Sequence, residues 1–487
     1  MKNSGGKKNM LDLKNAITLA PLIFLLACEV GPDYRPPKIN MPNLSDQQDI
    51  AEFATKKWWN VFSDFTLIKL EERALKHNSD LKQAIANIDI AREAAEVAAA
   101  DLLPSLGVSG EESSAFISKR GKNYIPGLSQ KRSTTDYLGA ASVSYEIDFF
   151  GKYRKANEAA RANLLSTRAA KESVLLSVTS EVAKTYFLLR ALDAKLAIAK
   201  RTLRARQEAC AVYKSRFKNG YCTELDYLRV ESEMSSVKTV VLDLESSLAK
   251  VETALSVLIG ASPREIVVQK TSKSQAIEKL RIPSSVPKGI PSDILARRPD
   301  VLQAEGQLMA ANAKIGEAGA ACFPSISLTG IFGFESNSLT QLFNSGSDMW
   351  NFNGKFSLPL FSGGKISALN NAAKANYRKM AAAYEKTIQI AFKETLDALV
   401  SNRKSREIVI SRTRQVNSLK RGYCIAKKQK DSGLIGLLDL LDVERGLLSA
   451  EMELVGALQN QLNAVVDLCK ALGGGWKVSQ WKKYPLK

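Results

Sequence analysis

The stretch that decides the fold runs from Gly220 to Glu231 and reads GYCTELDYLRVE. It recurs from Gly433 to Glu444 as GLIGLLDLLDVE, and both copies fit the pattern G-x4-L-D-x-L-x-V-E. Two shorter pairs recur in the same order: DLKQA at 80–84 with DVLQA at 300–304, and LPSL at 103–106 with FPSI at 323–326. Chance similarity between Leu-rich helices is the alternative, but several anchors in one order favour two copies of one structural unit.

Composition excludes a membrane protein built from many apolar helices. The 487 residues are 45% hydrophobic, and the mean hydropathy is -0.14. Both values are ordinary for a globular chain. Length alone would allow about two to four domains. The duplication instead indicates two halves that build one body.

One segment near the start is membrane-directed. Four lysines (Lys2, Lys7, Lys8 and Lys14) precede an apolar run over Ala16–Ala27, which is followed by Cys28. This order is typical of a secretory signal, and the run is too short to span a bilayer. A small residue directly before a cysteine is what lipoprotein processing requires. We therefore predict that Cys28 is the lipidated first residue of the mature chain; an ordinary signal peptide with an incidental cysteine is the alternative.

The net charge is +19, and removing the +3 of residues 1–27 leaves about +16. Such a charge raises nucleic-acid binding as a hypothesis. The basic residues are spread among acids along helical stretches, without a basic arm or an aromatic-basic motif, so this hypothesis is disfavoured. The same charge raises the expectation that a pore built by this chain would prefer anions.

No residues in the sequence form a catalytic constellation. His77 is the only histidine, and neither a phosphate-binding loop nor a metal-ligand spacing occurs. We therefore expect no enzyme activity and no cofactor apart from the lipid on Cys28. Five further cysteines have spacings that fit small apolar fillers on helices, and their redox state is left open: Cys210, Cys222, Cys322, Cys424 and Cys469.

The hydrophobic period changes from helical to alternating in both copies. From Tyr137 to Phe149 apolar residues occupy the odd positions, which predicts a long half-buried strand. The residues after Pro104 alternate in the same way. In the second copy, 325–334 and 350–360 repeat the pattern. Each copy therefore predicts two strands joined by a polar loop.

Long helices follow each pair of strands. No proline interrupts Arg154–Lys218 or Ile366–Lys430, and about 65 residues at about 1.5 Å each make a helix of roughly 100 Å. The chain then returns through Leu225–Ile259 and Leu438–Leu472. A further helix is expected over Thr66–Ala100, before the first strand.

These patterns divide the chain into six parts. They are a signal peptide (1–27), a Pro-rich lipid-anchored segment (28–60), a first repeat (61–262), a connector (263–290), a second repeat (291–476) and a basic tail (477–487).

The four predicted strands pose a physical problem. Their apolar face has no evident partner in the chain, four strands are too few to close a barrel, and an open sheet edge is not tolerated in lipid. Several chains that each contribute four strands to one transmembrane barrel would solve it, and symmetry allows two, three or four chains. A soluble sandwich or a helix-covered sheet is the alternative.

The chain resembles the TolC-like outer membrane factors, and within them the NodT-type lipoproteins. The residues that carry the resemblance are CEVGPDYRP at 28–36, WWNVF at 58–62, YEIDFFGK at 145–152, PSDILARRPD at 291–300, FPSISLTG at 323–330, PLFSGG at 359–364 and ALGGGW at 471–476. They occur in order over nearly the whole chain.

The resemblance implies a mostly α fold with a transmembrane β-barrel part. Two tandem repeats in each of three chains would form a 12-stranded barrel and a long periplasmic helical barrel. It also implies an outer-membrane exit duct for drugs or other small toxic compounds. The implied partners are a periplasmic adaptor and an inner-membrane pump of the RND or ABC type.

In such proteins the two repeated stretches lie at the periplasmic tip, so the resemblance makes Gly220, Asp226, Asp431, Gly433, Ile435 and Asp439 tip or gate candidates. Asp226 and Asp439 would either cap helices or make gate contacts. Ile435 stands where relatives often carry an acidic residue, which puts an aspartate ring in doubt. Asp431 is the candidate substitute.

Two other functions stay open on the sequence. An exit duct for protein or oligosaccharide export would share the same architecture. A lipid-anchored coiled-coil scaffold without a pore belongs to another class.

Overall fold

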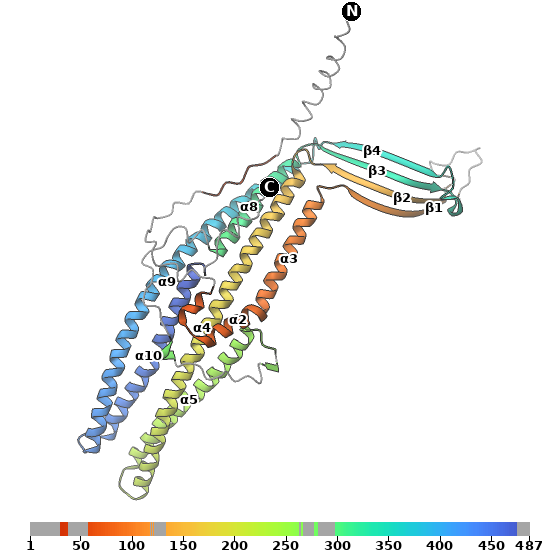
Figure 1. Ribbon diagram of the computed structural model, residues 1–487. Helices are drawn as coiled ribbons and strands as arrows, with labels where there is room; N and C mark the ends of the chain where they lie inside the picture. Colours follow the sequence, from red (N-terminus) through yellow and green to blue (C-terminus); the bar gives the residue numbers. More distant parts are fainter. Residues whose placement is uncertain are drawn as a thin grey trace, which may run out of the picture.

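The computed structural model of the chain describes residues 30–37, 57–116, 118, 120, 133–262, 264–265, 277–280 and 298–474. Four strands project from one end of a long helical body, and two helical hairpins form the other end (Figure 1). The predicted signal peptide, Cys28, most of the connector and the basic tail lie outside the described residues.

The strands form one antiparallel sheet in the order β1-β2-β3-β4. The first copy contributes β1 (Ser105–Phe116) and β2 (Ser133–Ile147), and the second contributes β3 (Ser325–Ser336) and β4 (Asp348–Ser357). The two copies join where β2 pairs with β3, with Val143 opposite Gly330. The four predicted strands are therefore present, and neither outer edge of the sheet pairs with another strand among the described residues.

The helices repeat in length as well as in order. The long helices α4 (Lys152–Lys218) and α9 (Lys365–Asp431) each have 67 residues. The returning helices α5 (Glu224–Leu258) and α10 (Leu437–Ala471) each have 35 residues. The duplication predicted from the repeated stretch is thus confirmed, and the predicted helix bounds differ from these by no more than two residues.

The first predicted helix, Thr66–Ala100, is wrong in one respect, because the chain breaks at Asn78 into α2 (Phe65–His77) and α3 (Ser79–Ala100). The Asn78 side chain accepts hydrogen bonds from the backbone N–H groups of Asp80 (2.9 Å) and Leu81 (3.1 Å). An asparagine that caps a helix in this way satisfies N–H groups that have no partner inside the helix, so it starts a new helix. In the second copy α8 (Pro299–Ala320) matches α3, with 22 residues each.

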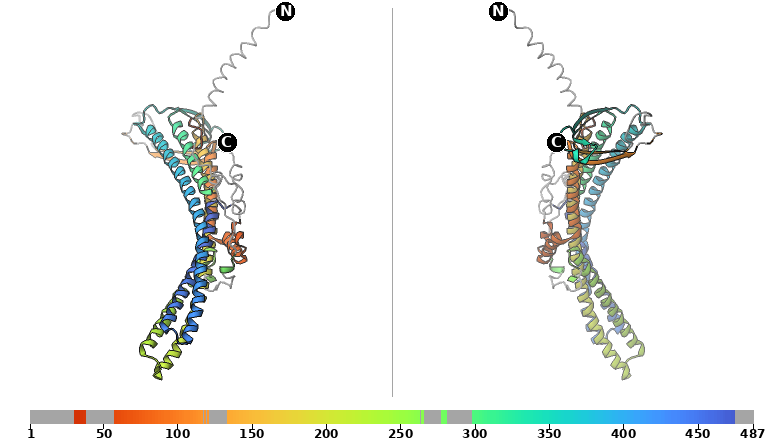
Figure 2. Two further views of the ribbon diagram at one scale, coloured as in Figure 1. Left: turned by 90° about the vertical axis from the view of Figure 1, so that its left-hand side faces the viewer. Right: turned by 90° about the vertical axis from the view of Figure 1, so that its right-hand side faces the viewer.

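The helices lie in a curved layer (Figure 2). Near the sheet their order is α3, α4, α8 and α9, and near the tip it is α5, α4, α10 and α9. The main core lies between these two halves, where the short 3-10 helix η1 (Trp58–Phe62) and α2 pack on α4 and α10. Phe62 and Phe187 meet edge to face at 4.9 Å. The Tyr186 hydroxyl donates to Asp64 at 2.8 Å.

Candidate functional site

The strand register places apolar and polar side chains on opposite faces of the sheet. Neighbours across the strands share a face. One row of such neighbours is Leu106, Val143, Gly330 and Phe352. The row one residue away is Ser105, Ser144, Thr329 and Asn353. The alternation predicted from the sequence is therefore realised as two continuous faces.

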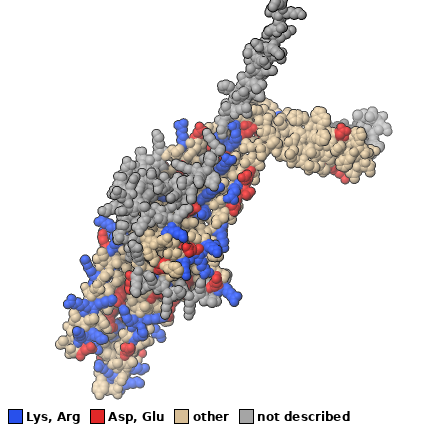
Figure 3. Space-filling view, in the orientation of Figure 1, with Lys and Arg blue, Asp and Glu red and all other residues tan. Residues whose placement is uncertain are grey.

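None of the described residues covers the apolar face. Leu106 is 83% exposed, Trp350 76% and Phe352 67%. Figure 3 shows that Lys and Arg side chains gather over the helical body and are scarce on the projecting sheet. An uncovered apolar face of this size indicates contact with lipid or with another chain.

Among the described residues, no helix combines the length and the apolar composition that a membrane crossing requires.

The first hairpin tip lies between α4 and α5. Gly220 has φ +73°, the left-handed conformation that ends a helix, and a Cβ there would meet nothing within 4 Å. Thr223 and Asp226 form a capping box: the Asp226 N–H donates to the Thr223 hydroxyl (3.2 Å), and the Thr223 hydroxyl and N–H donate to the Asp226 carboxylate (2.7 and 3.4 Å). Capping thus accounts for Asp226 at this tip.

The second tip repeats the geometry with fewer contacts. Gly433 has φ +76°, and the Gly436 N–H donates to the Asp439 carboxylate at 3.0 Å. Gly436 has no hydroxyl to complete the box. Asp431 is the exposed last residue of α9, and Ile435 is half-buried. The structure therefore gathers the candidate residues at two tips and gives Asp226 and Asp439 the same capping position.

A buried ion pair joins the two hairpins above the tips, and sequence reasoning missed it. Arg206 of α4 pairs with Glu444 of α10 at 3.0 Å, and its guanidinium side chain is 3% exposed. Burial raises the pKa of Tyr423 on α9 to about 12, and the neighbouring Glu444 carboxylate adds to the shift. Glu444 is the last residue of the repeated stretch, and this position is the only sequence feature that points to the ion pair. Its counterpart Glu231 instead accepts a hydrogen bond from Tyr227 at 2.8 Å.

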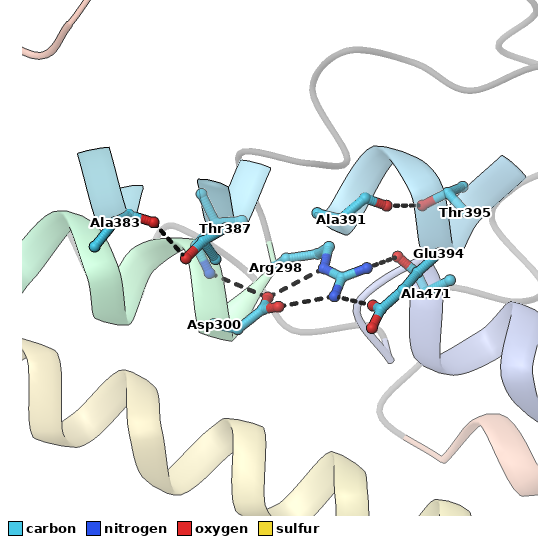
Figure 4. A network of polar contacts seen from close by, with 9 residues as sticks. Arg298, Asp300, Ala383, Thr387, Ala391, Glu394, Thr395 and Ala471 are labelled. Atoms are coloured by element: carbon cyan, nitrogen blue, oxygen red, sulfur yellow. Dashed lines mark hydrogen bonds and ion pairs between the residues drawn. The ribbon is translucent and has the colours of Figure 1, made fainter. Parts of the chain in front are cut away.

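A second buried arginine fixes the start of the second repeat. Arg298 donates to Asp300 (2.8 Å), to Glu394 of α9 (2.6 Å) and to the Ala471 carbonyl oxygen at the end of α10 (3.3 Å). These groups converge on one guanidinium (Figure 4). The planar fork of arginine suits such a convergence. Arg298 therefore holds α8, α9 and α10 together and has a structural role.

The described residues contain no cluster of His, Cys, Asp and Glu side chains placed to hold a metal ion. His77 is an exposed residue at the end of α2. Cys210 and Cys469 are buried, and the five described cysteines are free thiols.

Two features of the described structure are candidates for the functional surface: a sheet with one apolar and one polar face, and two capped helical hairpins. Such a surface belongs to a subunit of a multi-chain membrane channel.

Comparisons with known proteins identify the kind of channel. The profile of the outer membrane efflux protein family matches residues 70–261 and 290–474. The chain is 33% identical over 478 residues to the solvent efflux pump outer membrane protein SrpC of Pseudomonas putida, which covers 96% of this chain and 99% of SrpC. It is 30% identical over 475 residues to the probable outer membrane lipoprotein SilC of Salmonella typhimurium, covering 96% and 100%.

A solved structure agrees. The crystal structure of the CmeC outer membrane channel of Campylobacter jejuni matches with a TM-score of 0.87 and 29% identity, over 94% of this chain and 98% of CmeC. The chain therefore belongs to the outer membrane efflux protein family. It is an outer-membrane channel of the TolC-like kind and not an enzyme. Three chains build it, and it works with an adaptor and an inner-membrane pump. The alternative of a lipid-anchored coiled-coil scaffold without a pore is therefore wrong.

Proposed function

We propose that this channel is the exit duct of a tripartite system with an RND-type pump and that it passes small toxic compounds. The strand register carries the duct part of the proposal, because it gives each chain an apolar surface suited to lipid and a polar surface suited to lining a duct. The RND type of the pump is what the family resemblance implies. The described residues include no phosphate-binding loop that could bind a nucleotide for hydrolysis. Transport through the duct is then passive diffusion, and the pump supplies the work.

The name of SrpC supports the substrate class, since that relative is a solvent efflux protein. The test is complementation of a host that lacks its own outer-membrane efflux channel, together with the cognate adaptor and pump. We expect restored resistance to toluene and to a cationic dye. Surface-localised trimers that restore no resistance, but support secretion of a protein substrate, would instead establish the export function.

We propose that Cys28 carries the lipid anchor. The small residue before it and the signal-like segment support this assignment, as does the name of SilC. Mass spectrometry of the N-terminal peptide is the test. An unmodified Cys28 in the mature protein would exclude the anchor.

We propose that the two hairpin tips form the gate. Gly220, Asp226, Asp431, Gly433, Ile435 and Asp439 lie there. Above them, Arg206 holds α4 to α10 through the Glu444 carboxylate and the Leu441 carbonyl oxygen (3.4 Å). Opening would part the hairpins and break this buried pair. Breaking such a pair by removing one partner typically costs about 3–5 kcal/mol, so Arg206→Ala should raise single-channel conductance, and unchanged conductance would count against this gate.

A further inference from the structure

The two helical hairpins of one chain meet where α4 packs on α10. Near the tip the helices follow one another in the order α5, α4, α10 and α9, so α5 and α9 form the edges of the layer (Figure 1). When three chains close a ring, α9 of one chain comes to lie beside α5 of the next. We call this contact the interchain seam, and the contact of α4 with α10 the intrachain seam.

The duplication relates the two seams residue by residue. The helix α9 begins 213 residues after α4, at Lys365 against Lys152, and α10 begins 213 residues after α5, at Leu437 against Glu224. Each seam joins the long helix of one copy to the returning helix of the other. Positions that face each other across the intrachain seam therefore have counterparts, 213 residues away, that face each other across the interchain seam.

Carboxylates match the cations of the intrachain seam. Arg201 of α4 pairs with Glu451 of α10, whose side chain is 8% exposed. Arg206 pairs with Glu444 at 3.0 Å. A cavity of about 210 Å³ touches both carboxylates, and α4 and α10 supply most of its lining. The intrachain seam is therefore neutralised by its own ion pairs.

The interchain seam lacks this match. The counterparts of Arg201 and Glu451 are Arg414 and Lys238, so two cations face each other there. Both residues are exposed in the chain, and neither makes an ion pair with another described residue. No carboxylate lies within four residues of Arg414 on α9 or of Lys238 on α5. Like charges in such a place repel each other unless an anion lies between them.

The rest of the cavity lining changes as well. Its counterparts are Arg414, Gln415 and Ser418 of one chain, with Cys210, Glu231, Met234, Ser235 and Lys238 of the next. An amide and two hydroxyl groups thus replace a threonine, an alanine and a leucine. Glu231 accepts a hydrogen bond from Tyr227 at 2.8 Å and lies about 10 Å along α5 from Lys238. The hollow between the chains is therefore rich in hydrogen-bond donors, the groups that an oxyanion accepts.

We propose that each interchain seam holds an oxyanion site, in which Arg414 of one chain and Lys238 of the next bind a phosphate or carboxylate group of a small anion. Arginine supplies a planar fork that binds two oxygens at once, and lysine supplies a compact charge. A hollow of the size found in the intrachain seam holds a small polyvalent anion such as pyrophosphate. The bound anion joins two chains near the tip.

Isothermal titration calorimetry of the purified trimer with pyrophosphate tests the site. We expect saturable binding of one pyrophosphate per chain. Arg414→Gln and Lys238→Gln should each weaken this binding about tenfold or more, because each removes a charged hydrogen-bond donor. The matched control is Lys250→Gln, which removes an exposed lysine about 18 Å further along α5 and should bind as the parent does.

A second variant tests whether the two cations face each other, without any ligand. Lys238→Glu gives the interchain seam the arginine–carboxylate pair that Arg201 and Glu451 form within the chain. This variant should lose pyrophosphate binding and should raise the temperature at which SDS-resistant trimers dissociate. The gain should disappear when Lys238→Glu is combined with Arg414→Gln, because the new carboxylate then has no guanidinium to pair with.

A parent trimer that binds no pyrophosphate, or binds it as tightly as Arg414→Gln and Lys238→Gln do, would overturn the oxyanion site. Dissociation of Lys238→Glu trimers at the parent temperature would overturn the facing of Arg414 and Lys238 on which the site rests.

Discussion

Glu71 is a carboxylic acid buried in the core. Its side chain is fully buried in α2, and neither carboxylate oxygen has a hydrogen-bond partner among the described residues. Burial raises the pKa of Glu71 well above its ordinary value, because a low-dielectric surrounding disfavours the charged form. The folded chain therefore keeps this proton at pH values where the unfolded chain has lost it.

We predict that Glu71→Gln stabilises the protein above about pH 5. With the folded pKa raised, the free energy of unfolding falls as pH rises above the unfolded pKa, by up to about 1.4 kcal/mol per pH unit until the folded pKa is reached. Glutamine removes this titration. Thermal unfolding between pH 4 and pH 8 should show the two proteins alike at pH 4 and the variant more stable at pH 8. Parallel curves would contradict the prediction.

Asp439 also acts through a single contact. Its carboxylate, in the first turn of α10, accepts the Gly436 N–H at 3.0 Å, and a carboxylate at a helix N-terminus stabilises the helix by about 0.3–1 kcal/mol. We predict that Asp439→Ala accelerates amide exchange over residues 436–442, whereas Asp431→Ala leaves those amides unchanged. The double variant should raise conductance in a planar bilayer, because the tip is loosened. Equal amide exchange over residues 436–442 in Asp439→Ala and in the parent would show that the Asp439 carboxylate does not cap α10.

At the scale of elements, the sequence predicts what depends on local period. The bounds of α4 and α9 follow from apolar spacing and from the absence of proline, and the strand faces follow from alternation. Asn78 escapes such reasoning, because the helical pattern continues on both sides of it while its side chain starts a new helix. Arg206 escapes it as well, since its partner Glu444 is distant in sequence and is brought close only by the packing of α4 on α10.

The sheet faces predict opposite outcomes for neighbouring residues. Phe352 belongs to the apolar face and Asn353 to the polar face. A lysine on the lipid side of a barrel costs about 2–4 kcal/mol near the bilayer midplane. We predict that Phe352→Lys lowers the yield of heat-modifiable trimers in outer-membrane fractions, whereas Asn353→Lys does not. Equal losses in both variants would contradict the assignment of faces.

The polar face carries a charge opposite to that of the chain. In the described strands it bears four carboxylates and one lysine: Glu111, Asp136, Glu146, Glu335 and Lys355. Glu111, Leu138 and Glu335 share one row. Because charges that line a narrow polar passage act on ions more strongly than distant ones, we predict a cation preference, contrary to the expectation from net charge.

Reversal potentials in a salt gradient measure this preference. Glu111→Gln with Glu335→Gln should shift the potential toward anions, and Glu112→Gln on the apolar face is the matched control. Anion selectivity in the parent channel would contradict this prediction and support the expectation from the net charge.

At the scale of the whole molecule, the duplication explains why one chain is not a complete channel. Each copy supplies two strands and one long hairpin, so one chain yields a sheet with two free edges, β1 and β4. All twelve residues of β1 are exposed. In lipid, every backbone N–H and C=O group needs a partner. The free edge of β1 must therefore pair with β4 of a neighbouring chain in the membrane-inserted channel.

Disulfide trapping across this edge tests the closure. Ser109 of β1 lies on the polar face, as do Asn351, Asn353 and Lys355 of β4. We combine Ser109→Cys with a cysteine at each of these three positions in turn, with Cys322 and Cys424 replaced by serine. One pair should give disulfide-linked dimers and trimers that a reductant returns to monomers, while Ser109→Cys alone stays monomeric. Each chain offers one β1 edge and one β4 edge, so the largest disulfide-linked species has as many copies as the closed barrel has chains. A series of bands that ends at dimers, or continues beyond trimers, would therefore require a different number of chains.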